Sequence, residues 1–416
     1  MTAAEFRKSF TPGTLSDLSK MEDVLTIIRA VREMGDKALR SYSLAFDGVA
    51  TEELEVPAED AGQALAALEP ELRAALTAAR DNIIRYQRSI RWRGQEEGEL
   101  FQKIHPLGKV GIYVPGGKAA YPSTVLHTAV LAREAGVKEI IVVTPPRKEG
   151  VNRLVLAACA LAGVDRIFMT GGAQGIAALA YGTETIPRVD KIVGPGNQYV
   201  AMAKKLVYGD VGIDSIAGPS EIVVVIDEET DAEWAALDIL AQSEHDEMAR
   251  TFLLSESLEA LNRVENEAER LKERQPRKGI IDASLKDNHY AILTSSRAET
   301  AEVVNFIAGE HVSIQTRDAE DYVDLITTAG ALFLGPFAPE AIGDYSAGPS
   351  HVLPTGGNAR FASGLSINDF LRTNSVLNLS EATFRKAAPA AMALAREESL
   401  TAHHDSVSRR YEKGER

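Results

Sequence analysis

The sequence predicts an α/β protein with two parallel-sheet domains, a helical N-terminal segment and a helical C-terminal tail. Two observations carry this prediction. From residue 109, short apolar runs alternate with segments of helical periodicity, and glycine-rich turns join many of them. A second alternating series begins at residue 220. Strand, turn and helix repeated in this order are typical of a parallel sheet covered by helices on both faces.

The elements follow in order along the chain. Residues 20–92 are predicted to be helical throughout, because apolar residues recur at spacings of three and four and a second run begins at a proline. The first alternating series predicts strands within residues 109–117, 139–146, 166–174 and 191–197, each followed by a helix. The second series predicts strands within residues 220–227, 250–256, 289–296, 311–316 and 330–335. Residues 365–416 are too polar to form a core and are predicted to be a separate helical tail.

Composition narrows the class of partner. The chain has 416 residues, of which 45% are hydrophobic and 25% charged, as in soluble globular proteins. Its formal net charge of −15 argues against a nucleic acid or an acidic membrane as partner, because both attract clustered lysine and arginine. The N-terminus lacks the apolar region of a signal peptide, and no stretch is long and apolar enough for a membrane span. We therefore expect a cytoplasmic protein.

The single cysteine, Cys159, excludes both an intramolecular disulfide and a zinc site built from cysteines. It lies in the apolar helical stretch VLAACALAG. Free cysteines in such stretches are usually buried and inert, so we expect no thiol chemistry from this residue.

Four glycine-rich turns are expected where strands end, which is where open α/β sheets bind ligands. They read YVPGG (113–117), TGGAQG (170–175), VGPGNQY (193–199) and AGPSE (217–221). Glycine lets backbone N–H groups and helix N-termini approach phosphates. No copy matches the dinucleotide motif G-x-G-x-x-G, since GPGNQY has Tyr199 at the third glycine position. Each turn by itself fits a tight connection equally well, but four on one domain favour a ligand crevice.

The segment AQSEHDEMAR (241–250) gathers several side chains that bind metals or transfer protons. It ends a predicted helix that begins after Asp231, a typical N-cap residue. Gln242 and His245 are three positions apart and share one face of such a helix, whereas Glu244 points elsewhere. Glutamine is an uncommon zinc ligand, so this pair by itself fits a surface helix better than a metal site.

Other ionisable groups occur in unusual places. Glu310 and His311 are adjacent at the start of a predicted strand. They fit a general base beside a water activator, although a plain loop pair is the simpler interpretation. Asp344 and His351 lie in the segment 342–357, which is glycine- and proline-rich and too long for a simple turn. Long structured loops are often functional.

The polar tail adds Glu398, His403 and His404. Solvent exposure is the simpler interpretation of the two histidines. A helix residue, a loop aspartate and a tail histidine would nevertheless complete a four-ligand metal site with His245.

Together these segments resemble the histidinol dehydrogenase family from about residue 105 to 410. The matching segments occur in family order and read GIYVPGG, AAYPSTVL, VTPP, GGAQGIAALAYGTETIPRVDKIVGPGN, GIDSIAGPSE, AQSEHDEMA, EH, GDYSAGPSHVLPTGGNARFASGLS and LTAH. Such a series is more specific than any single motif. The N-terminal helices fit more loosely, since YQRSIRW stands where the family often has Phe-His-Glu, away from the catalytic motifs.

The resemblance implies the last step of histidine biosynthesis. In that reaction L-histidinol is oxidised through L-histidinaldehyde to L-histidine by a zinc-dependent enzyme that uses two NAD+. The resemblance also implies two incomplete Rossmann-like domains. Residues 11–114 with 221–362 would hold the catalytic and metal residues, and residues 115–220 would form the NAD crevice. Residues 1–10 would be an N-terminal arm, and residues 363–416 a helical tail exchanged between the subunits of a homodimer.

Carried over by motif, the resemblance implies four zinc ligands, Gln242, His245, Asp344 and His403. It implies an acid/base pair, Glu310 and His311, and three contacts to NAD, Tyr113, Gln174 and Asn197. Around the substrate, the zinc ligands and His311 would be joined by Ser220, His351 and Glu398. His404 competes with His403, but the spacing from Glu398 in ESLTAH favours His403.

The implied chemistry agrees with the residue types. Zinc would hold the amino alcohol through its amine and an imidazole nitrogen, and so orient the carbinol. His311, as a neutral imidazole near its usual pKa of about 6.5, would take the hydroxyl proton while hydride leaves to NAD+. Glu310 would activate water to hydrate the aldehyde, and the hydrate would lose the second hydride. This route is favoured over a cysteine nucleophile, because Cys159 lies in an apolar helix.

Three other interpretations stay open on the sequence. The nearest is a related dehydrogenase of another polar alcohol, such as a sulfonated propanediol, although EHD (244–246), GPSHVLPTGG and AAYPS favour the histidinol type. A zinc hydrolase needs the metal site but no dinucleotide crevice, so the four glycine turns count against it. A non-enzymatic metal-binding scaffold leaves Glu310 and His311 unexplained.

Overall fold

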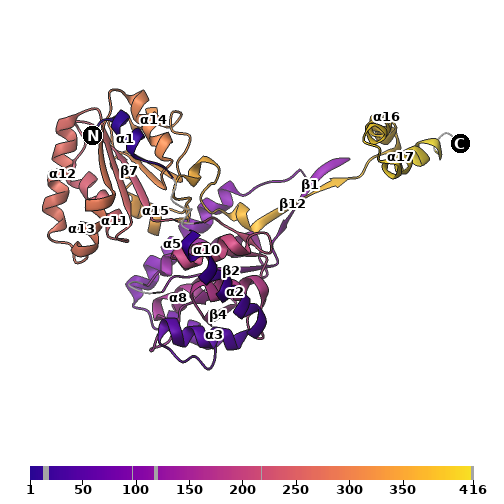
Figure 1. The fold of residues 1–416 in the computed structure, drawn as a ribbon, viewed down its shortest axis with the longest axis horizontal. Coiled ribbons are helices and arrows are strands. Elements are labelled where there is room, and N and C mark those ends of the chain that lie inside the picture. Colours follow the sequence, from indigo (N-terminus) through magenta and orange to yellow (C-terminus); the bar gives the residue numbers. More distant parts are fainter. Residues whose placement is uncertain (13–17, 96, 117–119, 217, 414–416) are drawn as a thin grey trace. The chain divides into compact units, whose positions relative to one another are not determined.

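The structure is a computed structural model that describes residues 1–12, 18–95, 97–116, 120–216 and 218–413 (Figure 1). Its contacts divide the chain into two units. The first comprises residues 1–91 and 107–370 and contains two parallel five-stranded sheets, so the predicted α/β class is confirmed. The second comprises residues 92–106 and 371–416. Among the described helices, none is long and apolar enough to cross a membrane.

The first alternating series builds one sheet, here called the β2 sheet. Its strands are parallel and lie in the order β4-β3-β2-β5-β6. They are β2 (Lys109–Tyr113), β3 (Glu139–Thr144), β4 (Arg166–Met169), β5 (Lys191–Val193) and β6 (Gly212–Ile213). The chain adds β3 and β4 on one side of β2 and then returns to add β5 and β6 on the other. Sheets of this kind bind ligands at such a switch point, beyond the carboxyl ends of the strands.

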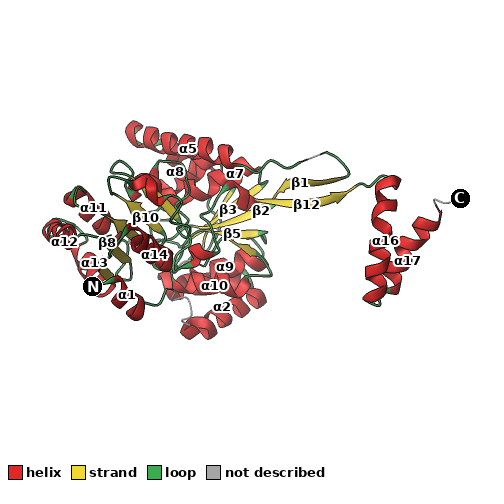
Figure 2. Cartoon of the chain, turned by 90° about the horizontal axis from the view of Figure 1, so that it is seen from above, coloured by secondary structure: helices red, strands yellow, loops and turns green. Residues whose placement is uncertain are grey.

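Helices lie on both sides of the strands of the first unit (Figure 2). One hydrophobic core joins the β2 sheet to α2 (Met21–Met34), α3 (Asp36–Tyr42), α9 (Gly172–Tyr181) and α10 (Gln198–Val207). The remaining helices of this half are α4 (Ala58–Ala66), α5 (Pro70–Ile90), α6 (Pro122–Val125), α7 (Leu131–Ala135) and α8 (Arg153–Ala162). A π-helical turn, η3 (Leu126–Val130), joins α6 to α7. The predicted helix start at Pro70 is confirmed.

Strand β2 lies at the centre of the β2 sheet, and helix α2 packs in the core of that sheet. The predicted domain boundary at residue 114 instead groups both elements with residues 221–362. The pairing of β2 accounts for its place, since it forms ladders with both β3 and β5. The apolar residues Val24 and Ile28 of α2 are buried in the same core as Ile176 of α9. The division at residues 220 and 362 stays a prediction.

The second alternating series builds the β7 sheet, whose strands are parallel and lie in the order β11-β10-β7-β8-β9. They are β7 (Glu221–Val225), β8 (Arg250–Ser255), β9 (His289–Leu293), β10 (His311–Ile314) and β11 (Ala331–Leu334). Its helices are α11 (Ala232–Ser243), α12 (Leu258–Lys272), α13 (Lys278–Asn288), α14 (Arg297–Ile307) and α15 (Glu340–Tyr345). All nine strands that the two series predict are present.

The predicted helical segment 20–92 is interrupted at residues 48–57. Gly48 adopts the left-handed conformation, with φ of 66°, and ends the preceding helical turn. Beyond it, Glu55 forms a bridge to Phe168, and the Val56 N–H donates to the Ile167 carbonyl at 2.9 Å. This stretch therefore extends the edge of the β2 sheet at β4, and the prediction of continuous helix is wrong here.

The N-terminal arm folds as helix α1 (Ala3–Ser9) and belongs to the core of the β7 sheet. Phe6 of this helix is fully buried. Its ring packs edge-on against Phe252 at 5.9 Å, Tyr290 at 5.5 Å and Phe306 at 6.2 Å between centroids. Aromatic contacts of this geometry stabilise beyond the area that they bury, so the arm is a structural part of the first unit.

The second unit begins with a two-stranded antiparallel ladder. Strand β1 (Leu100–Pro106) pairs with β12 (Leu371–Leu377) along their whole length. Helices α16 (Glu381–Glu397) and α17 (Thr401–Lys413) follow and pack against each other. The prediction of a wholly helical tail is therefore wrong for residues 371–377. These residues find a partner about 270 positions earlier, which local periodicity does not reveal.

The buried imidazole of His289, at the start of β9, is expected to make the stability of the fold depend on pH. Its Nδ1 lies 2.7 Å from Thr251 Oγ1, and burial lowers the pKa of its imidazole to about 4, against the opposing field of Glu269. The unfolded chain therefore takes up a proton near pH 6.5 that the folded chain refuses until about pH 4. This contribution to stability is present above pH 6.5 and is lost as the pH falls.

Replacing His289 with asparagine, which can keep the bond to Thr251, is expected to flatten the fall of the free energy of unfolding between pH 7 and 5. The expected difference in slope corresponds to about 2 kcal/mol over this range. Urea denaturation of both proteins at the two pH values measures it. Parallel pH dependences in the two proteins would contradict the buried, neutral state of His289.

Candidate active site

Helix α11 brings Gln242 into the interior of the first unit. Asp231 caps this helix as predicted, accepting from the N–H groups of Glu233 at 2.9 Å and Trp234 at 3.2 Å. The helix ends at Ser243, so His245 lies in the following turn, where its N–H donates to the Gln242 carbonyl at 3.2 Å. The prediction that both residues lie in the helix is therefore wrong for His245. Gln242 is fully buried and His245 is exposed.

The short helix α15 brings two carboxylates to His245. Glu340 and Asp344 are four positions apart and share one face of this helix. The side-chain ligand atoms of His245, Glu340 and Asp344 all lie within 4.8 Å of one another. His245 and Asp344 are predicted zinc ligands, but Glu340 is not. The segment PEAIGD holds the signal that identifies it, an acidic residue one helical turn before Asp344.

The Gln242 amide lies between a carboxylate and a backbone donor. With the amide turned so that both its ends find partners, Nε2 donates to both carboxylate oxygens of Glu340, at 3.1 Å to Oε2. Oε1 accepts from the Glu221 N–H at 3.2 Å. The opposite orientation sets oxygen against oxygen and N–H against N–H.

Glu310 and His311 lie at the start of β10 and are both buried. A Glu310 carboxylate oxygen accepts from the Glu221 N–H at 2.9 Å. The His311 ring donates from Nδ1 to the Glu221 carbonyl at 3.0 Å, since a carbonyl can only accept. Nε2 then faces Asp344 Oδ1 at 3.5 Å. The predicted acid/base pair and two predicted metal ligands therefore lie in one group.

The electrostatics of this group are dominated by buried carboxylates. Burial raises the pKa of Glu310 to about 8 and that of Glu340 to about 8. Burial alone would lower the pKa of His311, but Glu340, Glu310 and Asp344 outweigh it and raise that pKa well above its usual value. The expectation of a neutral His311 near its usual pKa is therefore wrong for the chain by itself.

A divalent cation fits this group of residues. Glu221 has Arg250 as its cationic partner at 3.3 Å, whereas the ion pairs of Glu310, Glu340 and Asp344 within the described ranges are all with His311. Three carboxylates, of which Glu310 and Glu340 are buried and Asp344 is partly buried, therefore share one imidazolium. Imidazole nitrogen and carboxylate oxygen are donors that zinc prefers. A cation here would also lower the pKa of His311, because it repels the ring proton.

Two predicted members belong to the second unit. Glu398 is the C-cap residue of α16, and His403 lies exposed on α17. The competing candidate His404 contacts Asp405 Oδ1 at 3.1 Å. The roles of Glu398 and His403 stay predictions.

His351 lies beside Asp344 and stacks on a second histidine. Its Nδ1 donates to the Asp344 carbonyl at 3.2 Å, and its ring packs on His127 with centroids 4.5 Å apart and planes at 25°. His127 comes from the π-helical turn η3 and is fully buried, and burial lowers its pKa to about 3. π-helical turns are frequent at functional sites. His127 was not among the predicted residues, because a histidine in an apolar helix usually belongs to the core.

Ser220 directly precedes β7 and is partly buried. Its carbonyl accepts from the Arg250 N–H at 2.9 Å, which links the starts of β7 and β8. Its predicted contact with substrate stays a prediction.

The residues predicted to contact NAD lie at the carboxyl edge of the β2 sheet. Tyr113 ends β2 and is buried, and its hydroxyl accepts from the Gly172 N–H at 3.3 Å. Gln174 lies in the first turn of α9, and its Oε1 is buried without a partner within the described part of the chain. Asn197 caps α10, accepting from Tyr199 N–H at 3.0 Å.

This edge fits a dinucleotide on its backbone geometry. The N-terminus of α10 lies beyond β5, one of the two strands that flank the switch point, and the N-terminus of α9 lies beyond β4 at the edge of the sheet. Gly194, after β5, has φ of 112°, and a Cβ there would collide with the Tyr113 carbonyl. Three of the four predicted turns lie at this edge, whereas AGPSE leads into the amino end of β7. Gly117 and Ala217 of these turns lie outside the described residues.

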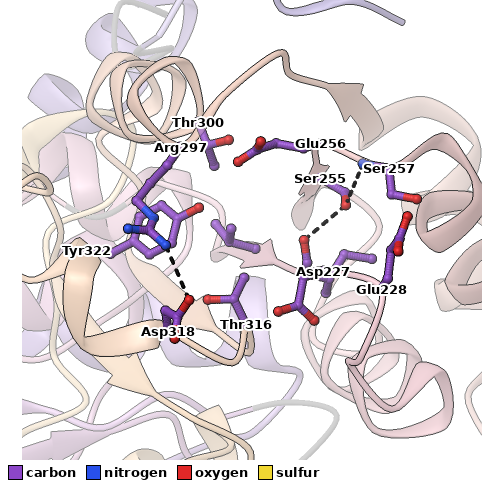
Figure 3. Close-up of a pocket in the computed structure, with 12 residues that line it drawn as sticks. Asp227, Glu228, Ser255, Glu256, Ser257, Arg297, Thr300, Thr316, Asp318 and Tyr322 are labelled. Carbon is purple, nitrogen blue, oxygen red and sulfur yellow. Dashed lines mark hydrogen bonds and ion pairs between the residues drawn. The ribbon is translucent and has the colours of Figure 1, made fainter.

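The carboxyl edge of the β7 sheet holds none of the predicted residues. A cavity of about 260 Å³ lies there, lined by polar side chains that include Asp227, Glu256 and Thr316 (Figure 3). Arg297 and Asp318 on its wall pair with each other at 3.5 Å. The ionisable group described above lies instead at the amino edge, where β7, β8 and β10 begin with Glu221, Arg250 and His311.

Cys159 is fully buried in α8, and burial raises the pKa of its thiol far above the usual range. The prediction of a buried cysteine is confirmed.

Comparison with known proteins agrees with this geometry. The family described as histidinol dehydrogenase matches residues 13–411. The histidinol dehydrogenase of Staphylococcus epidermidis is 50% identical over 409 residues, which cover 98% of this chain and 99% of that protein. That of Staphylococcus aureus is 48% identical over 410 residues, covering 98% of each chain. The crystal structure of histidinol dehydrogenase from Elizabethkingia anophelis superposes with a TM-score of 0.93 at 33% identity, covering 99% of this chain and 97% of that one.

Proposed function

Because the chain belongs to the histidinol dehydrogenase family and is therefore an oxidoreductase, we propose that it oxidises L-histidinol through L-histidinaldehyde to L-histidine in histidine biosynthesis. Zinc and two NAD+ would be required. The observation that carries the proposal is the position of His311 Nε2, which is buried without a hydrogen-bond partner among the described residues and lies 3.5 Å from Asp344. With a cation bound, which would lower the pKa of His311, Nε2 would be a base without a proton donor, and this fits a site that receives an alcohol.

In this proposal Gln242, His245 and Asp344 would hold the cation. When bound, zinc supplies a Lewis acid that orients the polar groups of the substrate, and NAD+ supplies the hydride acceptor. The Glu221 carbonyl keeps the proton of the His311 ring on Nδ1. Nε2 is then free to take the hydroxyl proton of the carbinol as hydride leaves.

Glu310 serves the second oxidation in this proposal. The Glu221 N–H holds one of its oxygens at 2.9 Å, which orients the carboxylate beside His311. It takes a proton from water as that water adds to the aldehyde carbonyl, and the resulting hydrate loses the second hydride to the second NAD+. A thiol route finds no nucleophile, because Cys159 is the only cysteine and is fully buried.

We extend the proposal to a homodimer in which the tail completes the site. Glu398 and His403 lie in the second unit, whose helices α16 and α17 pack on each other. A polar tail of this kind fits exchange between subunits. The partner's His403 would then supply the fourth zinc ligand, and the partner's Glu398 a contact to substrate.

The proposal predicts that purified protein reduces two NAD+ for each L-histidinol consumed. Pre-treatment with a chelator is expected to abolish the NADH signal, and added zinc to restore it. The absorbance of NADH measures both. No chelator-sensitive NADH with L-histidinol would overturn the proposal, and a much higher rate with a sulfonated propanediol would assign the chain to another polar alcohol.

A further inference from the structure

We propose that Glu340 is a positioning residue that sets the orientation of the Gln242 amide and thereby the affinity of the site for its cation. This inference rests on the proposed function, because it assumes that the cation binds at His245 and Asp344. Neither the family motifs in the sequence nor the predicted ligand set includes Glu340.

The first support is burial and contact. Glu340 is 2% exposed and Gln242 is fully buried, so water does not compete for their polar groups. Both carboxylate oxygens of Glu340 are within reach of Gln242 Nε2. A cation bound at the site would keep Glu340 ionised. The carboxylate then has no proton to donate, so only the N–H end of the amide can face it.

The second support is the weakness of the other constraint. The Glu221 N–H has two acceptors. It donates to Gln242 Oε1 at 3.2 Å and to the Glu310 carboxylate at 2.9 Å. One N–H shared by two acceptors holds the amide less firmly than a carboxylate that accepts from Nε2 with both oxygens. Glu340 therefore determines that the Nε2 end of the Gln242 amide faces its carboxylate and that the Oε1 end faces away from it. Oε1, the one atom of this side chain that can bind a cation, is kept away from the carboxylate.

The third support is that the two oxygens of Glu340 are already engaged. They accept from the amide, and Oε1 also lies 3.7 Å from His311 Nδ1. Glu340 thus contacts the predicted metal ligand Gln242 and lies beside the base His311. Groups that orient metal ligands in this way typically change metal affinity or activity by about 10- to 100-fold when they are removed.

The test uses three variants of the full chain, Glu340→Gln, Gln242→Glu and the double variant that exchanges the two side chains. Zinc affinity is measured by competition with a chromophoric chelator, independently of turnover. Each single variant is expected to bind zinc about 10- to 100-fold more weakly. Glu340→Gln leaves Gln242 Nε2 one acceptor in place of two and lets the amide turn, and Gln242→Glu sets carboxylate against carboxylate. The double variant is expected to recover most of that loss, since a carboxylate again faces an amide.

Asp238→Asn provides a matched control. Asp238 lies one turn before Gln242 on α11, is buried, and accepts from Gln315 Nε2 at 2.7 Å. It is thus a buried carboxylate paired with an amide that is not a predicted metal ligand. The control is expected to bind zinc within about twofold of the unmodified protein. A loss as large as that of Glu340→Gln would show a general effect of buried charge and overturn the inference.

Three further outcomes decide the inference. Wild-type affinity in Glu340→Gln, or losses that simply add in the double variant, would overturn it. Cobalt-substituted Glu340→Gln is expected to keep the visible spectrum of the cobalt wild type, because no ligand is removed. A changed spectrum would place Glu340 among the ligands and overturn the positioning role. If a single variant fails to fold, the double variant carries the test, and it is then required to bind zinc within about tenfold of the wild type.

Failure of this inference is distinguishable from failure of the proposed function. A wild-type protein that binds no zinc and yields no NADH would refute the function itself. A wild-type protein that does both, beside an unaltered Glu340→Gln variant, would refute only the role of Glu340.

Discussion

Replacing His311 with asparagine is expected to lower kcat for L-histidinol oxidation by about 100- to 10,000-fold, the usual contribution of a general base. Asparagine can keep the hydrogen bond that Nδ1 donates to the Glu221 carbonyl, at 3.0 Å in the structure, but it has no atom in place of Nε2. The substitution therefore removes the proton acceptor and retains the local backbone contact. KM is expected to change much less than kcat.

Steady-state kinetics and zinc analysis of the His311→Asn protein measure this result. Zinc content is expected to stay that of the unmodified protein, since His311 is not a predicted ligand. His289→Asn is the matched control, because His289 also begins a strand of the β7 sheet. The control is expected to turn over normally at pH 7. A kcat for His311→Asn within tenfold of the unmodified protein would contradict the base role.

Replacing Glu310 with glutamine is expected to slow the second oxidation much more than the first. Oxidation of L-histidinaldehyde is expected to fall by about 100- to 1,000-fold, because glutamine takes no proton from water. The first oxidation is expected to fall much less, since His311 keeps its Nε2 free. Glutamine can still accept from the Glu221 N–H, which holds Glu310 at 2.9 Å, so the backbone stays in place.

The ratio of NADH formed to L-histidinol consumed measures this difference. It is expected to fall from two toward one, with aldehyde captured by an added hydrazine. L-Histidinaldehyde supplied directly is expected to give almost no NADH. Equal losses in both steps would instead assign Glu310 a structural role at the start of β10.

Much of the fold follows from local patterns. Apolar runs bounded by glycine-rich turns predict all five strands of the β7 sheet and four of the β2 sheet, because a buried parallel strand needs apolar residues on both faces. Strand β6 has only two residues and gives no pattern of its own. The pairing of β1 with β12 depends on residues far apart in the chain, so periodicity cannot predict it.

The site is predicted only in part, for a related reason. Gln242, Glu310 and Asp344 stand out by their motifs, and the fold does bring them together. Glu340 does not stand out, because its importance arises from facing Gln242 across two helices that lie almost a hundred residues apart in sequence. His127 carries no signal in an apolar helical stretch until it is found stacked on His351.

The rule that ligands bind at the carboxyl edges of parallel strands holds for the predicted NAD contacts but not for the ionisable group. Tyr113 and Asn197 follow the ends of their strands, whereas Glu221 and His311 begin theirs. A strand start is shaped by the loops that precede it rather than by a recurring motif. Functional residues at strand starts are therefore harder to predict from the sequence than those in the glycine-rich turns at strand ends.

The burial of Cys159 has a consequence for an enzyme that would generate an electrophile. An aldehyde adds readily to an accessible thiolate, and a protein that releases one is exposed to its own product. The one thiol of this chain, on α8, is fully buried and stays protonated. An aldehyde product therefore has no accessible thiolate in the chain to which it can add. For the same reason alkylating reagents and mild peroxide have no thiol to attack.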